Sequence, residues 1–464
     1  MTKISPTPVV LTIAGSDSGG GAGIQADLKT FAALGVHGTS AITTVTAQDT
    51  TGVSAVHEIP PETVRLQIDA VVRDMGVMFA KTGMLSSSPI ISEVSKAIAE
   101  YGLKAVVDPV MVAKSGAPLL RKEAVASLKE QLIPLAHVLT PNVEEASALT
   151  KMEISSIEDV LRAGDLLLDM GARHVVIKGG HLPGEPVDTL FSRGSPPVFY
   201  MGERIPSKTT HGTGCTFSAA IASYLALGNS VADAVGMAKR FVRNAILYGL
   251  EVGKGVGPVN PISNLEVDAE KFRVVASVTD ALCLLESSEY APLLSPECQI
   301  NLAMSLPLRY ALGVASVCGI PGRISNAGGR LKPASSPAFG GSRHVASAIL
   351  SAMRYDPEMR SAMNIRYSEE MLGVLKELGY SHSSYDRTKE PPEVKASEGA
   401  SVPWGIQEAI KAHGGIPDVI YHTGDWGKEP MMLIFGRDAV EVATKAIRIA
   451  RRLSQPLSAG TPSG

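Results

Sequence analysis

Cysteine is scarce in this chain, with four residues among 464. The four cysteines, at positions 215, 283, 298 and 318, form neither a Cys-x-x-Cys pair nor a closely spaced framework. Zinc ribbons and small disulfide-stapled folds require one of these two patterns. The cysteine content therefore indicates neither a zinc site nor a disulfide scaffold.

An excess of charge and a long apolar run are also missing. The net charge is −3, which provides no basic surface for a polyanion, so we expect no nucleic-acid partner. No apolar run approaches the roughly 18 residues that a membrane span needs, and residues 1–6 lack the layout of a secretion signal. We therefore expect a soluble, cytoplasmic protein with no membrane partner.

The chain has ample material for hydrophobic cores, because 45% of its residues are hydrophobic. Its length corresponds to about three domains of average size, and two domains of unequal size fit equally well. A glycine- and proline-rich stretch, Gly253–Pro261, is the expected linker. We expect domains at residues 1–260 and 261–453, followed by a disordered tail at residues 454–464.

A glycine turn near the middle of the chain is the most informative stretch. Gly212 and Gly214 flank Thr213, and the run from Cys215 to Leu225 is apolar and rich in alanine, which predicts a buried helix. The turn would point unpaired N–H groups and the positive end of the helix dipole at one place. These residues predict an anion-binding turn with Cys215 beside it.

The first half alternates short apolar runs with helical periodicity. A strand at Val9–Ala14, the loop Gly15–Gly23 and a helix at Ile24–Leu34 come first, without a dinucleotide fingerprint or a Walker loop. Further strands are expected at Ser40–Ala47, Phe79–Met84, Ala105–Val112, Val138–Thr140 and His174–Lys178. Helices are expected at Pro61–Met75, Pro89–Tyr101, Arg121–Leu132, Ile157–Met170 and, capped by Ser230, at Ser230–Leu250. This order predicts an α/β fold with a mostly parallel sheet and helices on both faces.

Polar residues follow the ends of the expected strands. They are Gln48, Lys81–Met84, Asp108–Val112, Thr140–Glu145 and Lys178–His181. In open parallel sheets, ligands bind beyond the carboxyl ends of the strands. Five polar strand ends in succession predict a ligand site along one edge of the sheet.

Seven motifs, in order, resemble the hydroxymethylpyrimidine/phosphomethylpyrimidine kinases of thiamine biosynthesis, which belong to the ribokinase-like superfamily. The resemblance spans about Val9–Val259 and is carried by Ala14–Lys29, Thr46–Thr50, Lys81–Leu85, Val107–Val112, Thr140–Ala146, Ile177–His181 and His211–Cys215. It implies two ATP-dependent phosphorylations of 4-amino-5-hydroxymethyl-2-methylpyrimidine, first at the hydroxymethyl oxygen and then at the resulting phosphate. A pyridoxal kinase, which is a close relative, is the alternative.

The resemblance also implies roles for individual residues. It places the pyrimidine ring against Gly15, Asp27, Gln48, Met84 and Val110. It places Lys178 near the nucleotide phosphates, together with Gly212, Thr213 and Gly214, and gives Asp108, Asn142 and Glu145 to hydrated Mg²⁺. Carboxylate and amide groups suit an aminopyrimidine edge, although Met84 and Val110 taken alone are typical of a core and Asp27 of a solvated helix.

Cys215 suggests a mechanistic hypothesis. Many ribokinase-like sugar kinases have an aspartate base at this position, and its fixed charge would repel the phosphate that attacks in the second step. A thiol can stay neutral in that step, and a helix N-terminus is expected to lower its pKa enough to accept a proton in the first. We therefore predict that Cys215 is catalytic and permits both steps.

The second half of the chain has a different sequence pattern, and we expect a smaller α/β domain there. The pattern predicts helices at Asp268–Leu285 and from Ser295, strands at Asp418–His422 and Met431–Phe435, and a long surface loop at Ser381–Val402. A further helix, His344–Tyr355, follows a second glycine turn. Arg343 and His344 would lie in its first turn, where positive charge is unfavourable unless an anion sits between them.

This second half resembles the thiamine-phosphate synthase domain of the non-barrel type that occurs fused behind such kinases. The resemblance covers about Val267–Leu453 and is carried by Glu289–Leu293, Pro321–Arg323, Phe339–Ala346 and Thr423–Pro430. It implies that thiazole phosphate displaces pyrophosphate from the pyrimidine diphosphate, with Arg323 and His344 catalytic. The alternative is a module that senses thiamine phosphates. Small molecules are the expected partners, and a homo-oligomer, a dimer, is expected because kinases of this kind commonly pair through sheet edges.

Overall fold

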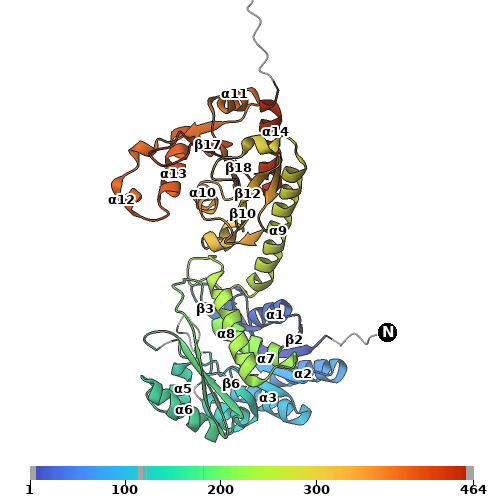
Figure 1. Cartoon of the computed structure of the whole chain (residues 1–464). Coiled ribbons are helices and arrows are strands. Elements are labelled where there is room, and N and C mark those ends of the chain that lie inside the picture. Colours follow the sequence, from blue (N-terminus) through green and yellow to red (C-terminus); the bar gives the residue numbers. More distant parts are fainter. Residues whose placement is uncertain (1–6, 113–115, 117–118, 122, 181, 456–464) are drawn as a thin grey trace, which may run out of the picture. The chain divides into compact units, whose positions relative to one another are not determined.

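The computed structural model describes residues 7–112, 116, 119–121, 123–180 and 182–455. The chain forms two compact units, Met1–Leu265 and Glu266–Gly464 (Figure 1). His181 and most of the expected tail, residues 456–464, lie outside the described residues. In the part that is described, no helix is long and apolar enough to cross a membrane.

The first unit alternates strands and helices. Its strands are β1 (Val9–Asp17), β2 (His37–Gln48), β3 (Val53–Glu58), β4 (Phe79–Thr82), β5 (Lys104–Val107), β6 (Ala136–Leu139), β7 (His174–Ile177), β8 (Val187–Ser192) and β9 (Ser195–Met201). Its helices are α1 (Gly23–Ala33), α2 (Pro61–Met75), α3 (Ser88–Tyr101), α4 (Ala124–Ser127, continued by turns over Leu128–Leu135), α5 (Val143–Thr150), α6 (Ile157–Asp169), α7 (Thr213–Ala226) and α8 (Val231–Leu247). Ser230 caps α8, as expected, because its side chain accepts the N–H of Asp233.

These strands form one nine-stranded sheet in the order β3-β2-β1-β4-β5-β6-β7-β8-β9. The pairs from β2 to β7 are parallel, whereas β3, β8 and β9 pair antiparallel at the two edges. The expected α/β fold with a mostly parallel sheet is confirmed. The carboxyl ends of its central strands therefore lie along a single edge.

Helices cover both faces of this sheet. Alternate residues of each central strand point to opposite faces, so each strand contributes to two cores. Val10, Val106 and Val138 pack in one core cluster with α1, α7 and α8. Leu11 and Val107 belong to the other cluster, with α2, α3, α5 and α6 (Figure 1). This double covering explains why the strands read as apolar runs rather than as alternating patterns.

The second unit contains shorter elements. Helix α9 (Ser263–Ser287) begins just before it, and its strands are β10 (Leu302–Ser305), β11 (Val317–Gly319), β12 (Ile324–Ala327), β13 (Arg330–Pro333), β14 (Ala338–Phe339), β15 (Ser361–Arg366), β16 (His382–Ser384), β17 (Val419–His422) and β18 (Met431–Gly436). Its other helices are α10 (His344–Ala352), α11 (Glu369–Glu377), α12 (Pro392–Ala396), α13 (Ser401–His413) and α14 (Ala439–Leu453). Seven strands form a second sheet in the order β14-β11-β10-β15-β18-β17-β16, and β12 pairs with β13 in a hairpin. All pairs of the seven-stranded sheet are antiparallel except β16 with β17, which are parallel. The prediction of a second, smaller α/β unit is confirmed.

Three predictions about the course of the chain are wrong. No helix begins at Ser295: residues 297 and 298 donate their N–H groups to the Glu429 carboxylate, so a distant side chain replaces the helix cap. The expected loop Ser381–Val402 contains β16 and α12. The expected linker Gly253–Pro261 belongs to the first unit, where its backbone bonds to Thr50, Lys208 and His211.

Candidate active sites

A cavity of about 1180 Å³ opens in the first unit at the carboxyl edge of the parallel strands. Its wall includes residues from β1 and β2, those that directly follow β4 to β7, and the first turn of α7. Twelve residues predicted from the sequence line it: Gly15, Gln48, Met84, Asp108, Val110, Asn142, Glu145, Lys178, Gly212, Thr213, Gly214 and Cys215. The described structure thus brings together all but one of the residues predicted for the kinase half. The exception is Asp27, which does not line the cavity and is fully buried behind Lys81.

The glycine turn has the backbone conformation that the sequence predicts. Gly212 has a φ of 81°, and a Cβ atom there would lie 1.8 Å from the carbonyl oxygen of Gly21. Gly212 is the N-cap of α7 and supplies no side-chain cap. The Thr213 N–H donates to the Thr210 carbonyl oxygen, which leaves the N–H groups of Gly214 and Cys215 for a ligand. A Cβ at Gly214 would lie 3.5 Å from both Asp108 Oδ2 and Lys178 Nζ. The open helix start, a cation and a carboxylate therefore meet at one wall.

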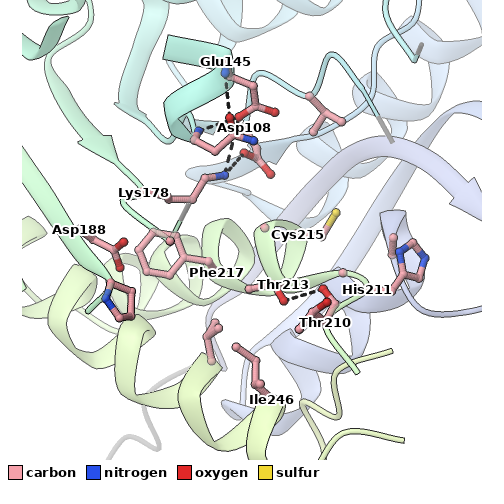
Figure 2. A pocket seen from close by; sticks show the side chains of 18 of the residues that line it. Asp108, Glu145, Lys178, Asp188, Thr210, His211, Thr213, Cys215, Phe217 and Ile246 are labelled. Carbon is pink, nitrogen blue, oxygen red and sulfur yellow. Dashed lines mark hydrogen bonds and ion pairs between the residues drawn. The ribbon is translucent and has the colours of Figure 1, made fainter. Parts of the chain in front are cut away.

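Lys178 is the cation at this wall (Figure 2). Its Nζ lies 2.9 Å from Asp108 Oδ1 and 4.0 Å from Glu145 Oε2. Burial lowers the pKa of the Lys178 ammonium, but the Asp108 and Glu145 carboxylates outweigh it, so this pKa is raised. Burial also raises the pKa of the Glu145 carboxyl to about 7, although Lys178 opposes the shift. Lys178 is thus a permanent positive charge between two acids.

The acids at this wall offer oxygen ligands of the kind that Mg²⁺ prefers. Asn142 and Glu145 form a capping box at the start of α5: Glu145 N–H donates to Asn142 Oδ1 (2.7 Å), and Asn142 N–H donates to Glu145 Oε2 (2.8 Å). Among the described residues, no group of three or more His, Cys, Asp or Glu side chains is arranged around a metal position. A hydrated ion held by Asp108 and Glu145 fits the chemistry of these donors, because two carboxyl groups lie at one wall and both are close to Lys178 Nζ.

Cys215 lies on the first turn of α7, partly exposed on the cavity wall. Burial raises the pKa of its thiol to about 11, while the nearby Lys81 ammonium opposes the shift. The prediction that the helix N-terminus lowers this pKa is therefore wrong. Desolvation, together with the smaller effects of the Asp27 and Asp108 carboxylates, outweighs the Lys81 ammonium and the N–H that Gly23 donates to the sulfur. The thiol stays neutral near pH 7.

Several cavity residues were not predicted. The Asp17 carboxylate accepts the N–H groups of Gly19, Gly21 and Ala22, and its Oδ2 lies 3.1 Å from His211 Nε2. His211 in turn lies 3.0 Å from Gln48 Nε2, so one network fixes the first glycine loop to the turn before α7. Asp17 and His211 were visible in the quoted motifs, but only their proximity reveals the network.

A second pair of charged cavity residues was not predicted from the sequence, because strand β8 was not predicted. Asp188, on β8, accepts the N–H of Gly179 and lies 2.8 Å from Lys239 Nζ on α8. Both residues line the cavity, and Figure 2 shows Asp188 on the same side as Phe217. This pair ties the segment after Lys178 to α8.

The second unit brings its two predicted residues close together. Arg323 follows β11 and has a φ of 71°, which is a strained conformation for a residue other than glycine. His344 is the first residue of α10, whose start also lacks a side-chain cap. Asn301 joins the two segments, because its side chain bonds to the backbone of Ile320 and to the carbonyl oxygen of Gly341.

The electrostatic environment of His344 is strongly positive. Burial lowers the pKa of its imidazole, and four neighbouring cations lower it further: Arg323, Lys428, Arg387 and Arg343. Of these, Lys428 and Arg387 were not assigned from the sequence, because they come from distant parts of the chain. Such a gathering of cations beside an open helix start is typical of an anion site.

Comparison with known proteins assigns each unit to a family. Residues 17–260 match the phosphomethylpyrimidine kinase family, and residues 277–448 match the thiamine-phosphate synthase ThiN family. A bifunctional thiamine biosynthesis protein ThiDN from Methanocaldococcus jannaschii is 33% identical over 439 residues, covering 94% of this chain and 97% of the relative. The chain belongs to this bifunctional family. It is a kinase joined to a thiamine-phosphate synthase, an enzyme of thiamine biosynthesis.

The kinase unit has further relatives. A hydroxymethylpyrimidine/phosphomethylpyrimidine kinase from Bacillus subtilis is 54% identical over 253 residues, covering 54% of this chain and 93% of the relative. Among solved structures, a pyridoxal kinase from Bacillus subtilis in complex with ADP is 42% identical, with a TM-score of 0.53, and covers 56% of this chain and 99% of that one. A pyridoxal kinase from Staphylococcus aureus in complex with AMP-PCP and pyridoxal is 36% identical, with a TM-score of 0.52, covering 56% and 95%. These neighbours confirm the ribokinase-like α/β fold, and both bind an adenine nucleotide or its analogue.

Proposed function

We propose that the cavity of the kinase unit performs both phosphorylations of hydroxymethylpyrimidine. The observation that carries this proposal is the meeting of Lys178, the Asp108 carboxylate and the open start of α7 on one wall. The pyrimidine would lie near Gly15, Gln48, Met84 and Val110, with the ATP phosphates over the glycine turn. Mg²⁺ held by Asp108 and Glu145 would neutralise phosphate charge.

The chemistry needs positioning more than covalent participation, because phosphoryl transfer passes through a loose transition state. In the first step the hydroxymethyl oxygen attacks the γ-phosphorus of ATP and loses its proton to water, the bond to the β-phosphate oxygen breaks, and ADP leaves. The Lys178 ammonium and the N–H groups of α7 stabilise the charge on the γ-phosphoryl oxygens. The neutral Cys215 thiol lies beside them and adds no negative charge.

We expect the Cys215→Asp variant to lose the second phosphorylation selectively. A carboxylate about 8 Å from the attacking phosphate, at an effective dielectric constant of about 20, costs roughly 2 kcal/mol, or about thirtyfold in rate. The first step, on an uncharged hydroxyl, should be affected much less. Each step is measured as ADP release from its own purified substrate. Undiminished turnover of the monophosphate would contradict this role, and Cys215→Ser is the control for side-chain size.

A pyridoxal kinase would differ from a hydroxymethylpyrimidine kinase in the acceptor that it phosphorylates. The two pyridoxal kinases among the solved structures share the fold of this unit, so pyridoxal is a reasonable competing acceptor. We expect kcat/KM for hydroxymethylpyrimidine to exceed that for pyridoxal at least tenfold. A reversed preference in parallel assays would make the kinase unit a pyridoxal kinase.

In the synthase unit we propose that Arg323 and His344 hold the leaving pyrophosphate. The cations around His344 and the open start of α10 support this assignment. The ring nitrogen of thiazole phosphate forms a bond to the pyrimidine methylene carbon as the bond from that carbon to the pyrophosphate oxygen breaks. Fixed positive charge favours this step because pyrophosphate gains charge as it leaves.

We also propose that the enzyme is cytoplasmic, where ATP is supplied, and that it forms a homodimer. Strands β3 and β9 are the edges of the first sheet and expose apolar side chains, among them Val56 and Phe199. Sedimentation of the full chain should therefore give twice the chain mass of 48.6 kDa.

A further inference from the structure

A buried ion pair stands behind the pyrimidine end of the cavity. Lys81, in β4, is fully buried, and its Nζ lies 2.9 Å from Oδ2 of Asp27, which is also fully buried in α1. The same Asp27 oxygen accepts a hydrogen bond from Thr12 Oγ1 at 2.6 Å. Within the described residues, the other oxygen, Asp27 Oδ1, has no hydrogen-bond partner.

Such a pair is unusual as a purely structural device. Taking two charges out of water is costly, and a well-packed apolar pair of similar volume is often as stable. The pair is also incompletely satisfied, because an ammonium has three donors and the described residues give Lys81 one acceptor, Asp27 Oδ2. Two N–H groups of the Lys81 ammonium therefore remain for a ligand.

The two members of the pair differ in access to the cavity. Lys81 lines it, as do Gly15, Met84 and Cys215, whereas Asp27 does not. The neighbouring Gly83 leaves room for the ammonium, because a Cβ there would lie 2.8 Å from Lys81 Nζ. Burial lowers the pKa of Lys81, but the Asp27 carboxylate outweighs it, with a smaller contribution from Asp108, and the pKa is raised. Lys81 is therefore a cation on the cavity wall.

The two substrates of the kinase differ by one phosphate group. Hydroxymethylpyrimidine has an uncharged acceptor, whereas its monophosphate brings up to two negative charges next to the γ-phosphate of ATP. Lys178 is already paired with Asp108 at the turn before α7. The Cys215 thiol is neutral, and Asp17 is paired with His211. Lys81 is likewise paired, with Asp27, but Lys178 lies at the turn where the γ-phosphoryl group would be transferred, so Lys81 is the cation that we assign to the phosphate of the monophosphate.

We propose that Lys81 is the specificity-determining residue for the second phosphorylation, in which its ammonium binds the phosphate of the pyrimidine monophosphate. Asp27 positions the ammonium through the remaining donor. The bound phosphate oxygen attacks the γ-phosphorus of ATP, the bond to the β-phosphate oxygen breaks, and ADP leaves. Lys81 makes no such contact in the first step, because the acceptor there carries no charge.

The test compares the two steps in variants of the full chain. Lys81→Met alone would leave a buried, unpaired carboxylate, so the main variant is the double replacement Lys81→Met with Asp27→Asn, which removes both charges. We expect KM for the monophosphate to rise at least thirtyfold and kcat/KM for hydroxymethylpyrimidine to change less than fivefold. Lys96→Met, an exposed lysine on α3, is the matched control and should leave both steps unchanged.

The Asp27→Asn variant alone provides the opposite test. It keeps the cation and removes its counter-charge, so the preference for the monophosphate should rise or stay constant. If Asp27 bound the pyrimidine ring, Asp27→Asn would instead lower kcat/KM equally for both substrates. If the ratio of the two kcat/KM values does not fall in the double variant, or falls equally in Asp27→Asn, Lys81 does not select the monophosphate. Thermal unfolding of each variant identifies loss of fold.

Discussion

Replacing Lys178 by methionine is expected to lower both phosphorylations by roughly 10³-fold and to leave thiamine-phosphate synthesis unchanged. The ammonium lies 2.9 Å from Asp108 and beside the first turn of α7, where the γ-phosphoryl group would be transferred. Methionine fills a similar volume and removes the charge. The loss should appear in kcat for hydroxymethylpyrimidine and for its monophosphate alike.

The second unit is the internal control for this prediction. Synthesis from supplied pyrimidine diphosphate and thiazole phosphate should proceed at the unmodified rate, because that site is built from other residues. Removing Lys178 also leaves two acids adjacent, and we expect the already raised pKa of Glu145 to rise further, which keeps one acid neutral. Retention of more than a tenth of the activity in either step would contradict the assignment of Lys178.

The Arg323→Gly variant is expected to lower synthesis on the order of 10²-fold without loss of fold. Arg323 has a φ of 71°, which glycine adopts without strain, so the backbone is preserved while the guanidinium is removed. The affected quantity is the rate of pyrophosphate release from the pyrimidine diphosphate in the presence of thiazole phosphate.

Two comparisons make this variant informative. Arg330→Ala, at an exposed position of β13, removes a nearby arginine and should leave the rate unchanged. Both phosphorylations should also remain intact in Arg323→Gly. Normal synthesis in that variant would show that Arg323 has only a structural role, through its bond to the Cys298 carbonyl oxygen.

The central sheet of the kinase unit was predictable because its strands are buried on both faces. Runs such as Val9–Ala14 stand out from the helices between them, and the polar residues after each run locate the cavity edge. The edge strands β8 and β9 were not predicted. Much of β9 is exposed, and its hydrophobic residues Val198, Phe199 and Met201 do not alternate with polar ones.

The residues of the sites were predictable where a motif carried them, and their electrostatics were not. A helix N-terminus alone suggested an acidic thiol at Cys215, but the pKa depends on desolvation and on Asp27 and Asp108, which come from other elements. The same is true of Asp27, whose contact with Lys81 joins residues 54 positions apart. The false helix at Ser295 has a comparable origin, because Glu429 binds the local N–H groups from 132 residues away.

Product analysis of the full chain tests the two-site account most directly. The chain is incubated with ATP, Mg²⁺, hydroxymethylpyrimidine and thiazole phosphate together, and the products are separated. The account predicts thiamine phosphate, with two ADP and one pyrophosphate formed for each molecule. Accumulation of the pyrimidine diphosphate without thiamine phosphate would contradict the role of the second unit, and consumption of no ATP would contradict that of the first.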